Sequence, residues 1–231
     1  MNPQIHIGHV RQHPIVRGAI YPTIYLDRSE FDLILNPLKS FFKYNHIAIR
    51  NTFNFQIMKY PTIQFVVIRD LRDTLISLYY SMKYSHPLLT EDYAQKRLRI
   101  ECLDQEDALI GLIKNFMVRQ AQIQMSWLQS HQDILTVRYE DLIRNEYDEF
   151  ERIIDYCQIS VSKKRLYEIV KGNSFENFTG RKRGEEDIHS HQRKGIAGDW
   201  RNHFTDRIKA IFKKAYGEVL IKTGYERDLN W

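Results

Sequence analysis

The sequence has few cysteines and no long apolar run, and each of these absences excludes a class of protein. The two cysteines, Cys102 and Cys157, are too few for a disulfide framework and lack a C-x-x-C spacing, which favours a reducing compartment. No stretch approaches the about 18 consecutive apolar residues of a transmembrane helix. Residues 1–10 carry histidines and polar groups where a signal peptide has a basic and then an apolar segment. We therefore expect a cytoplasmic protein without a membrane partner.

Length and charge set further bounds. The 231 residues, of which 43% are hydrophobic and 27% charged, are enough for one substantial core, so one domain over residues 1–231 is expected. The net charge of +5 suits a polyanionic small ligand, nucleic acid or an acidic membrane surface equally well. Charge alone therefore does not choose between these partners.

A short apolar run followed by a helical pattern indicates a strand-turn-helix unit. Ile63–Ile68 has the length and the β-branched composition of a buried parallel strand, and Thr74–Tyr84 has apolar residues at helical spacing. The intervening Arg69–Asp73 segment is then a strand-to-helix turn, the place where α/β proteins keep phosphate sites.

The remaining pattern continues the alternation of strands and helices. We expect a long amphipathic helix over Glu106–Gln129, a second strand over Ile134–Val137 and a helix that reaches Ile154. A further helix, capped by Ser162, ends near Val170, and a long charged loop follows over Lys171–Asn202. A closing helix is capped by Thr205 and stopped by Gly224. Short buried strands between helices predict an α/β fold with a parallel sheet flanked by helices.

The strand-turn-helix unit contains the first candidate anion site. Arg69 ends the strand and Ser77 lies on the helix beyond it, so a cationic fork and a hydroxyl could meet one phosphate at a helix N-terminus. The alternative is a local salt-bridge cluster that caps the helix and consists of Arg69, Asp70, Arg72 and Asp73. The segment alone does not separate these two interpretations.

A second segment points to the same chemistry. Arg193 and Lys194 directly precede Gly195, whose missing side chain allows backbone N–H groups to approach an anion closely. A solvated turn is the common alternative for such a cationic pair, but two separate segments now indicate phosphate.

Together these segments resemble the cytosolic-type sulfotransferases. That family shares a strand-turn-helix of the form Arg-Asp-x-x-Asp-x-x-x-Ser-x-Tyr and a later Arg-Lys-Gly-x-x-Gly-Asp-Trp segment, and both occur here in order. A Tyr-Glu-Asp-Leu segment begins at Tyr139, and Ser174-Phe175 matches a Ser-Phe pair that precedes the late basic loop in the family. The resemblance is clearest over residues 44–231 and implies an α/β architecture related to the nucleotide kinases.

The resemblance also implies a donor and its binding residues. The expected donor is 3'-phosphoadenosine 5'-phosphosulfate, and the expected acceptor is a small molecule with a hydroxyl or amine. The adenine would lie between Tyr139 and Phe175. The residues expected at the 3'-phosphate are Arg69, Ser77, Arg193, Lys194 and Gly195.

A catalytic histidine is predicted with a departure from the family pattern. Relatives carry a base about twenty residues before the phosphate-binding arginine, and His46 is at a suitable distance before Arg69. A neutral imidazole suits this work. The lysine that usually stands two residues before the base is Tyr44 here.

One family element is absent from the sequence. Relatives bind the 5'-phosphosulfate with a loop like Pro-Lys-Ser-Gly-Thr-Thr-Trp, and no segment before His46 combines its lysine, glycine and threonine. We expect that the chain begins after this loop. The alternative to an active transferase is therefore a truncated, inactive relative that at most binds the 3'-phosphate end of the nucleotide.

Other chemistries find less support. No Gly-x-x-x-x-Gly-Lys-Ser/Thr is present, which disfavours a P-loop nucleotidase. His189 and His191 lack a metal-site context, so no metal is expected. The basic run Arg181–Arg183 is offset by the acidic Glu185–Asp187, so no nucleic-acid partner is expected. The oligomeric state is left open.

Overall fold

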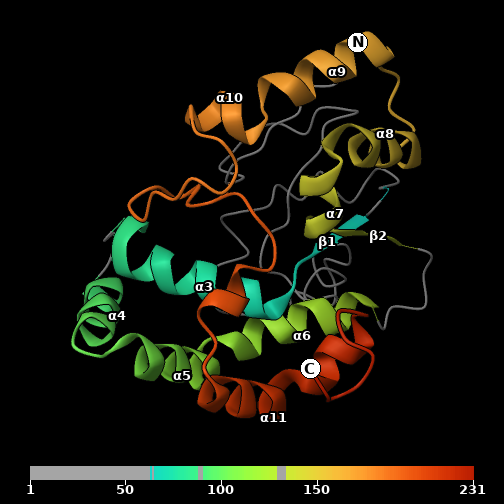
Figure 1. Cartoon of the computed structure of the whole chain (residues 1–231). Coiled ribbons are helices and arrows are strands. Elements are labelled where there is room, and N and C mark those ends of the chain that lie inside the picture. Colours follow the sequence, from blue (N-terminus) through green and yellow to red (C-terminus); the bar gives the residue numbers. More distant parts are fainter. Residues whose placement is uncertain (1–62, 64, 88–90, 129–133) are drawn as a thin grey trace, which may run out of the picture.

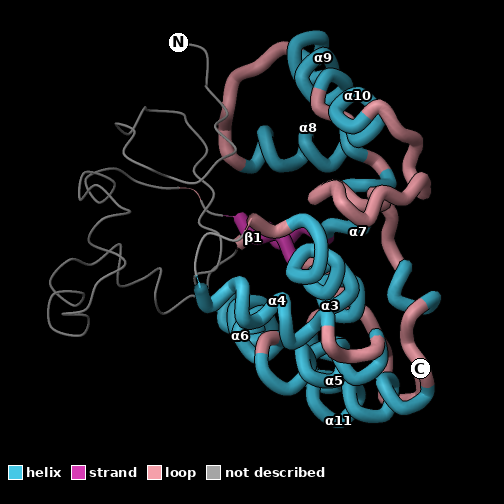
Figure 2. The backbone as a smooth tube through the Cα atoms, turned by 90° about the vertical axis from the view of Figure 1, so that its left-hand side faces the viewer, coloured by secondary structure: helices cyan, strands magenta, loops and turns pink. Residues whose placement is uncertain are grey.

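The computed structural model describes residues 63, 65–87, 91–128 and 134–231. Within these residues the fold is α/β, with a parallel pair of strands flanked by helices (Figure 1). In both views α8, α9 and α10 lie on one side of the strands, and α5, α6 and α11 on the other (Figures 1 and 2). The predicted base, His46, lies outside the described residues.

The two strands are shifted slightly from their expected bounds. Strand β1 is Phe65–Ile68 and strand β2 is Leu135–Arg138, and they pair in parallel with Ile68 opposite Arg138. The expectation that β1 is buried throughout is wrong, because Val67 is 46% exposed while Ile68 is 2% exposed. Successive side chains of a strand point to opposite faces, and only one face of β1 packs fully.

The helices follow the chain order seen in Figure 1. Their bounds are α3 Leu71–Tyr80, the π-turn η3 Ser81–Ser85, α4 Glu91–Glu101, α5 Gln105–Asn115, α6 Met117–Leu128, α7 Tyr139–Arg144, α8 Glu146–Tyr156, α9 Lys163–Gly172, α10 Phe175–Thr179, the 3₁₀ turn η4 Asp199–Asn202 and α11 Asp206–Lys222. In the part of the chain that is described, none of these helices is long and apolar enough to cross a membrane.

Helix α3 begins earlier than its apolar pattern predicts. It starts at Leu71 instead of Thr74, because the Asp70 side chain accepts the backbone N–H of Arg72 and caps the helix there. The turn after β1 is thereby reduced to Arg69 and Asp70. The helical pattern expected up to Tyr84 is also interrupted, since α3 ends at Tyr80 and continues as the π-turn.

The expected long helix over Glu106–Gln129 is wrong. Two helices, α5 and α6, meet at Phe116, whose backbone leaves the helical region with φ −121°. The side-chain amide of Asn115 donates to the carbonyl of Gly111 at 2.8 Å, a local bond that competes with the helical pattern. Similarly, the helix expected to reach Ile154 is divided at Asn145 into α7 and α8.

Other boundaries agree with the sequence. Ser162 and Thr205 cap α9 and α11 through their side chains, as predicted. The predicted loop over Lys171–Asn202 is not irregular throughout, since it contains the short helix α10 and the turn η4.

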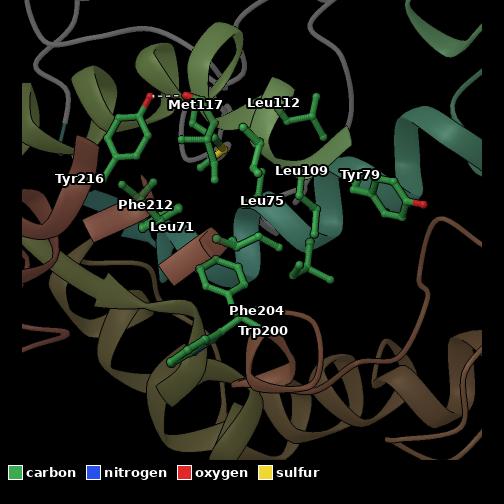
Figure 3. Close-up of a cluster of buried hydrophobic side chains, with 14 of the residues drawn as sticks. Leu71, Leu75, Tyr79, Leu109, Leu112, Met117, Trp200, Phe204, Phe212 and Tyr216 are labelled. Atoms are coloured by element: carbon green, nitrogen blue, oxygen red, sulfur yellow. Dashed lines mark hydrogen bonds between the residues drawn. The ribbon is translucent and has the colours of Figure 1, made fainter. Parts of the chain in front are cut away.

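The main core lies between α3, α5, α6, η4 and α11 (Figure 3). Leu75 of α3, Leu109 of α5 and Phe212 of α11 are fully buried in it. The aromatic rings of Trp200 and Phe204 also pack into this cluster, 5.3 Å apart. The segment that carries the Arg-Lys-Gly motif is therefore anchored in the same core as the strand-turn-helix unit.

Candidate functional site

The carboxyl edge of the two strands brings the first two candidate residues together. Because Ile68 pairs with Arg138, the next residues, Arg69 and Tyr139, leave the sheet side by side. The Arg69 guanidinium carbon lies 4.6 Å from the centre of the Tyr139 ring. The Arg69 carbonyl accepts a 2.8 Å hydrogen bond from the side-chain amide of Gln124 on α6, which fixes this edge against the helix.

The Arg69 guanidinium is only partly engaged. Its Nε is buried and has no hydrogen-bond partner among the residues that the structure describes. The salt-bridge cluster considered as the alternative does form, but between Arg72 and Asp70, with 2.7 Å between Nη2 and Oδ2. Within the described residues Arg69 makes no ion pair with either acid. Helix capping thus falls to Asp70 and its partner Arg72, and Arg69 takes no part in it.

Arg72 serves the fold beneath the site. Its guanidinium is 2% exposed and lies between the rings of Trp200 and Trp231, at 4.0 and 4.5 Å from their centres. It also donates to Glu226 at 2.5 Å. A buried cation with two carboxylates and two aromatic faces is satisfied on all sides, so it locks the chain end against the start of α3.

One face of α3 carries the remaining contacts. Asp73, Ser77 and Tyr80 are spaced so that they lie along the same side of the helix. Asp73 accepts the backbone N–H groups of Gly198 and Trp200, at 2.5 and 2.9 Å. Ser77 lies between Asp73 and Tyr80 on this face, and within the described residues its side chain makes no hydrogen bond.

The second basic segment reaches this face of α3. The Arg193 guanidinium carbon lies 4.3 Å from the centre of the Tyr80 ring, one helical turn beyond Ser77. The structure therefore places Arg193 over the helix face that also carries Ser77. The cations Arg69 and Arg193 come from segments that are more than a hundred residues apart.

Both cations of the Arg-Lys-Gly motif are held by carboxylates. Arg193 donates to Asp199 and Glu186, and Lys194 bonds to Asp199 at 2.8 Å. Burial alone would raise the pKa of Asp199, but the hydrogen bonds from Lys194 and Arg193 outweigh it and hold that pKa well below its usual range. These bonds use two of the five N–H donors of the guanidinium, so both side chains keep donors for a further anion.

Gly195 lies where a side chain could not. Its φ is +65°, and an added Cβ would lie 2.6 Å from the Phe175 ring. Phe175 begins α10, which Ser174 caps through the N–H of Asn177. The glycine therefore allows the backbone to pass directly over the aromatic ring.

The basic run Arg181–Arg183 holds this backbone in place. Arg181 donates to the carbonyls of Arg193 and Glu185, both at 2.7 Å. Arg183 donates to the carbonyl of Gly195 at 2.8 Å and pairs with Glu146. Arg181 and Arg183 therefore fix the backbone on both sides of the Arg-Lys-Gly motif.

Several groups around this site are not predicted by the sequence pattern. The Asp73 link to Gly198 and Trp200 could have been suspected, because an acid at that position is part of the quoted motif. Tyr80 and Gln124 gave no signal, because neither is among the apolar positions or the candidate anion-binding residues of the sequence pattern. Among the described residues no group of three or more histidine, cysteine or acidic side chains is arranged to hold a metal ion.

Known proteins match this chain over the region that contains the segments described above. A family model described as Sulfotransferase domain matches residues 42–224. Mouse Sulfotransferase 2B1 is 25% identical over 171 residues, which cover 66% of this chain and 46% of that protein. Zebrafish Cytosolic sulfotransferase 1 is 29% identical over 100 residues, covering 40% of this chain and 33% of that protein. The chain thus spans about a third to a half of the length of these relatives.

The fold has a solved counterpart. The crystal structure of mouse sulfotransferase SULT7A1 complexed with PAP aligns with a TM-score of 0.51 at 22% identity. The alignment covers 71% of this chain and 60% of that one. At this identity the likeness shows the shared α/β fold.

Proposed function

Because the chain belongs to the sulfotransferase domain family, we propose that it binds 3'-phosphoadenosine 5'-phosphosulfate and transfers the sulfuryl group to a hydroxyl or amine of a small acceptor. One observation supports this proposal: Arg193 of the late basic segment lies 4.3 Å from the Tyr80 ring, on the face of α3 that also carries Ser77, and Arg69 lies at the strand end just before this helix. Cations and a hydroxyl are the groups that bind a dianionic phosphate.

The residues fit the donor in two further ways. The buried, unpartnered Nε of Arg69 and the open donors of Arg193 and Lys194 are groups that a phosphate would satisfy. The ring of Tyr139 at the strand edge and that of Phe175 beneath Gly195 offer flat apolar faces for a base. The donor supplies the group to be transferred, whereas these residues hold its nucleotide end.

His46 stays the proposed general base, on the family pattern alone. We also propose one domain over residues 1–231 and a cytoplasmic location, the latter supported by the similarity to a relative named as cytosolic. The second candidate function is nucleotide binding without transfer. It applies if no lysine, glycine and threonine loop contributes to the site, because removing even one preorganised donor from such a loop typically costs ~10²–10³-fold in rate.

Calorimetric titration distinguishes these proposals. We expect adenosine 3',5'-bisphosphate to bind the wild type, and Arg193→Ala or Ser77→Ala to lose ~1.5–3 kcal/mol, or about 10- to 100-fold in affinity, for each charge-assisted bond removed. Arg165→Ala is the matched control, since this exposed arginine of α9 pairs only with Glu168 at 3.4 Å among the described residues. Absence of binding by the wild type would refute the donor assignment.

A transfer assay then separates enzyme from binder. With the phosphosulfate donor and a phenolic acceptor, turnover that His46→Gln abolishes would support the transferase. If the wild type binds adenosine 3',5'-bisphosphate and the phosphosulfate donor equally and gives no turnover, the non-catalytic candidate is correct.

A further inference from the structure

Asp73 makes a connection that helix capping does not require. An acid in the first turn often bonds back to the N–H of the capping residue. Here Glu140 of α7 performs that task, accepting the N–H of Asp70 at 2.9 Å. The carboxylate of Asp73 is therefore free to point to another segment, and both of its oxygens accept backbone N–H groups more than 120 residues away in the sequence.

The two N–H groups flank a residue that matters for the site. Gly198 and Trp200 stand on either side of Asp199, whose carboxylate binds the side chains of Arg193 and Lys194. A fixed backbone at both neighbours fixes where that carboxylate lies. The position of the two cations thus depends on Asp73 through the backbone and then through Asp199.

Asp73 lies on α3, the helix that also carries Ser77. Asp73 is one turn before Ser77 and follows Arg69 by four residues. Its side chain is 2% exposed, so the connection is protected from water. Burial raises the pKa of Asp73, while the two N–H groups and the charge of Arg69 oppose that rise.

From this geometry we propose that Asp73 is the positioning residue of the 3'-phosphate site. By holding the backbone at Gly198 and Trp200, it sets the distance between the Arg193-Lys194 pair and the Arg69-Ser77 pair. The inference rests on the proposed function and extends it, because it names the residue that lets the protein distinguish a nucleotide with a 3'-phosphate from one without.

Asp73→Asn tests this with two nucleotides. The amide has the same shape but keeps only one acceptor, so one of the two N–H groups loses its partner. We expect the affinity for adenosine 3',5'-bisphosphate to fall by about tenfold or more, while the affinity for adenosine 5'-monophosphate changes by less than about twofold. Asp104→Asn is the matched control, since that carboxylate also accepts a backbone N–H, from Asp107 at 2.8 Å, but caps α5.

A purely structural role would give another result. If Asp73→Asn weakens both nucleotides equally, or lowers the melting temperature without changing the ratio of the two affinities, the positioning role is wrong. If Asp73→Asn does not fold, Asp73→Glu is measured instead, because the longer carboxylate keeps the charge but displaces the bound backbone. The changes in affinity for the two nucleotides are then compared in the same way.

Hydrogen exchange separates this inference from the proposed function. In Asp73→Asn the backbone amide of Gly198 or Trp200 should exchange faster, while the amides of α3 keep their wild-type rates. If the wild type binds neither nucleotide, the proposed function fails, and the exchange rates alone decide whether Asp73 positions this segment. Unchanged rates at both amides would overturn the inference in every case.

Discussion

Replacing Gly195 by alanine tests the close approach of the basic segment to Phe175. Two costs add up at this position. A residue with a side chain at φ +65° loses about 1–2 kcal/mol to left-handed strain. The new Cβ would also lie 2.6, 2.7 and 2.9 Å from three atoms of the Phe175 ring, an overlap of the kind that costs about 1–3 kcal/mol in packed regions. We expect a loss of about 2–5 kcal/mol in the free energy of unfolding.

Urea denaturation with a matched variant separates the two costs. Gly180 has a similar φ of +71°, but nothing lies within 4 Å of an added Cβ. Gly180→Ala should therefore show the strain alone, and the difference between the two variants gives the ring contact. In a Phe175→Ala background the overlap is removed, so Gly195→Ala should then cost no more than Gly180→Ala.

Two results would refute this reasoning. Equal losses for the two glycine variants would show that the ring does not restrict Gly195. A loss that persists at full size in the Phe175→Ala background would assign the cost to the backbone instead. Under the proposed function, Gly195→Ala should also weaken adenosine 3',5'-bisphosphate, because either the ring or the backbone that carries Lys194 must move.

Two further substitutions probe the packing around the site. The lowered pKa of Asp199 means that its contribution to stability is complete above its ordinary pKa of 3.8 and is lost progressively as the pH falls below that value, so the fall in melting temperature below about pH 4 should be shallower in Asp199→Asn than in the wild type; an unchanged profile would contradict the ion-pair assignment. Trp231→Ala removes one of the two rings against Arg72 and should cost about 1–3 kcal/mol in thermal unfolding. The 65% exposed Phe178 is the control, and an equal loss for Phe178→Ala would show that the Arg72 contact adds nothing.

Only tertiary structure decided how the predicted site residues are held. Asp199 was recognised only as part of a motif, yet it binds both Arg193 and Lys194. Asp73 finds its partners across 125 residues of sequence, and Arg72 lies between two tryptophans that follow it by more than a hundred residues. Nothing in a local pattern specifies such partners, because they depend on how separate elements pack.

What the sequence determined by itself is local. The strand-turn-helix unit and the caps at Ser162 and Thr205 follow from hydrogen bonds and backbone angles within a few residues. The break at Phe116 was not foreseen, because the apolar residues on both sides of it keep a helical spacing. Local interactions thus determine which helices and strands form, and burial against distant elements determines which side chains come into contact.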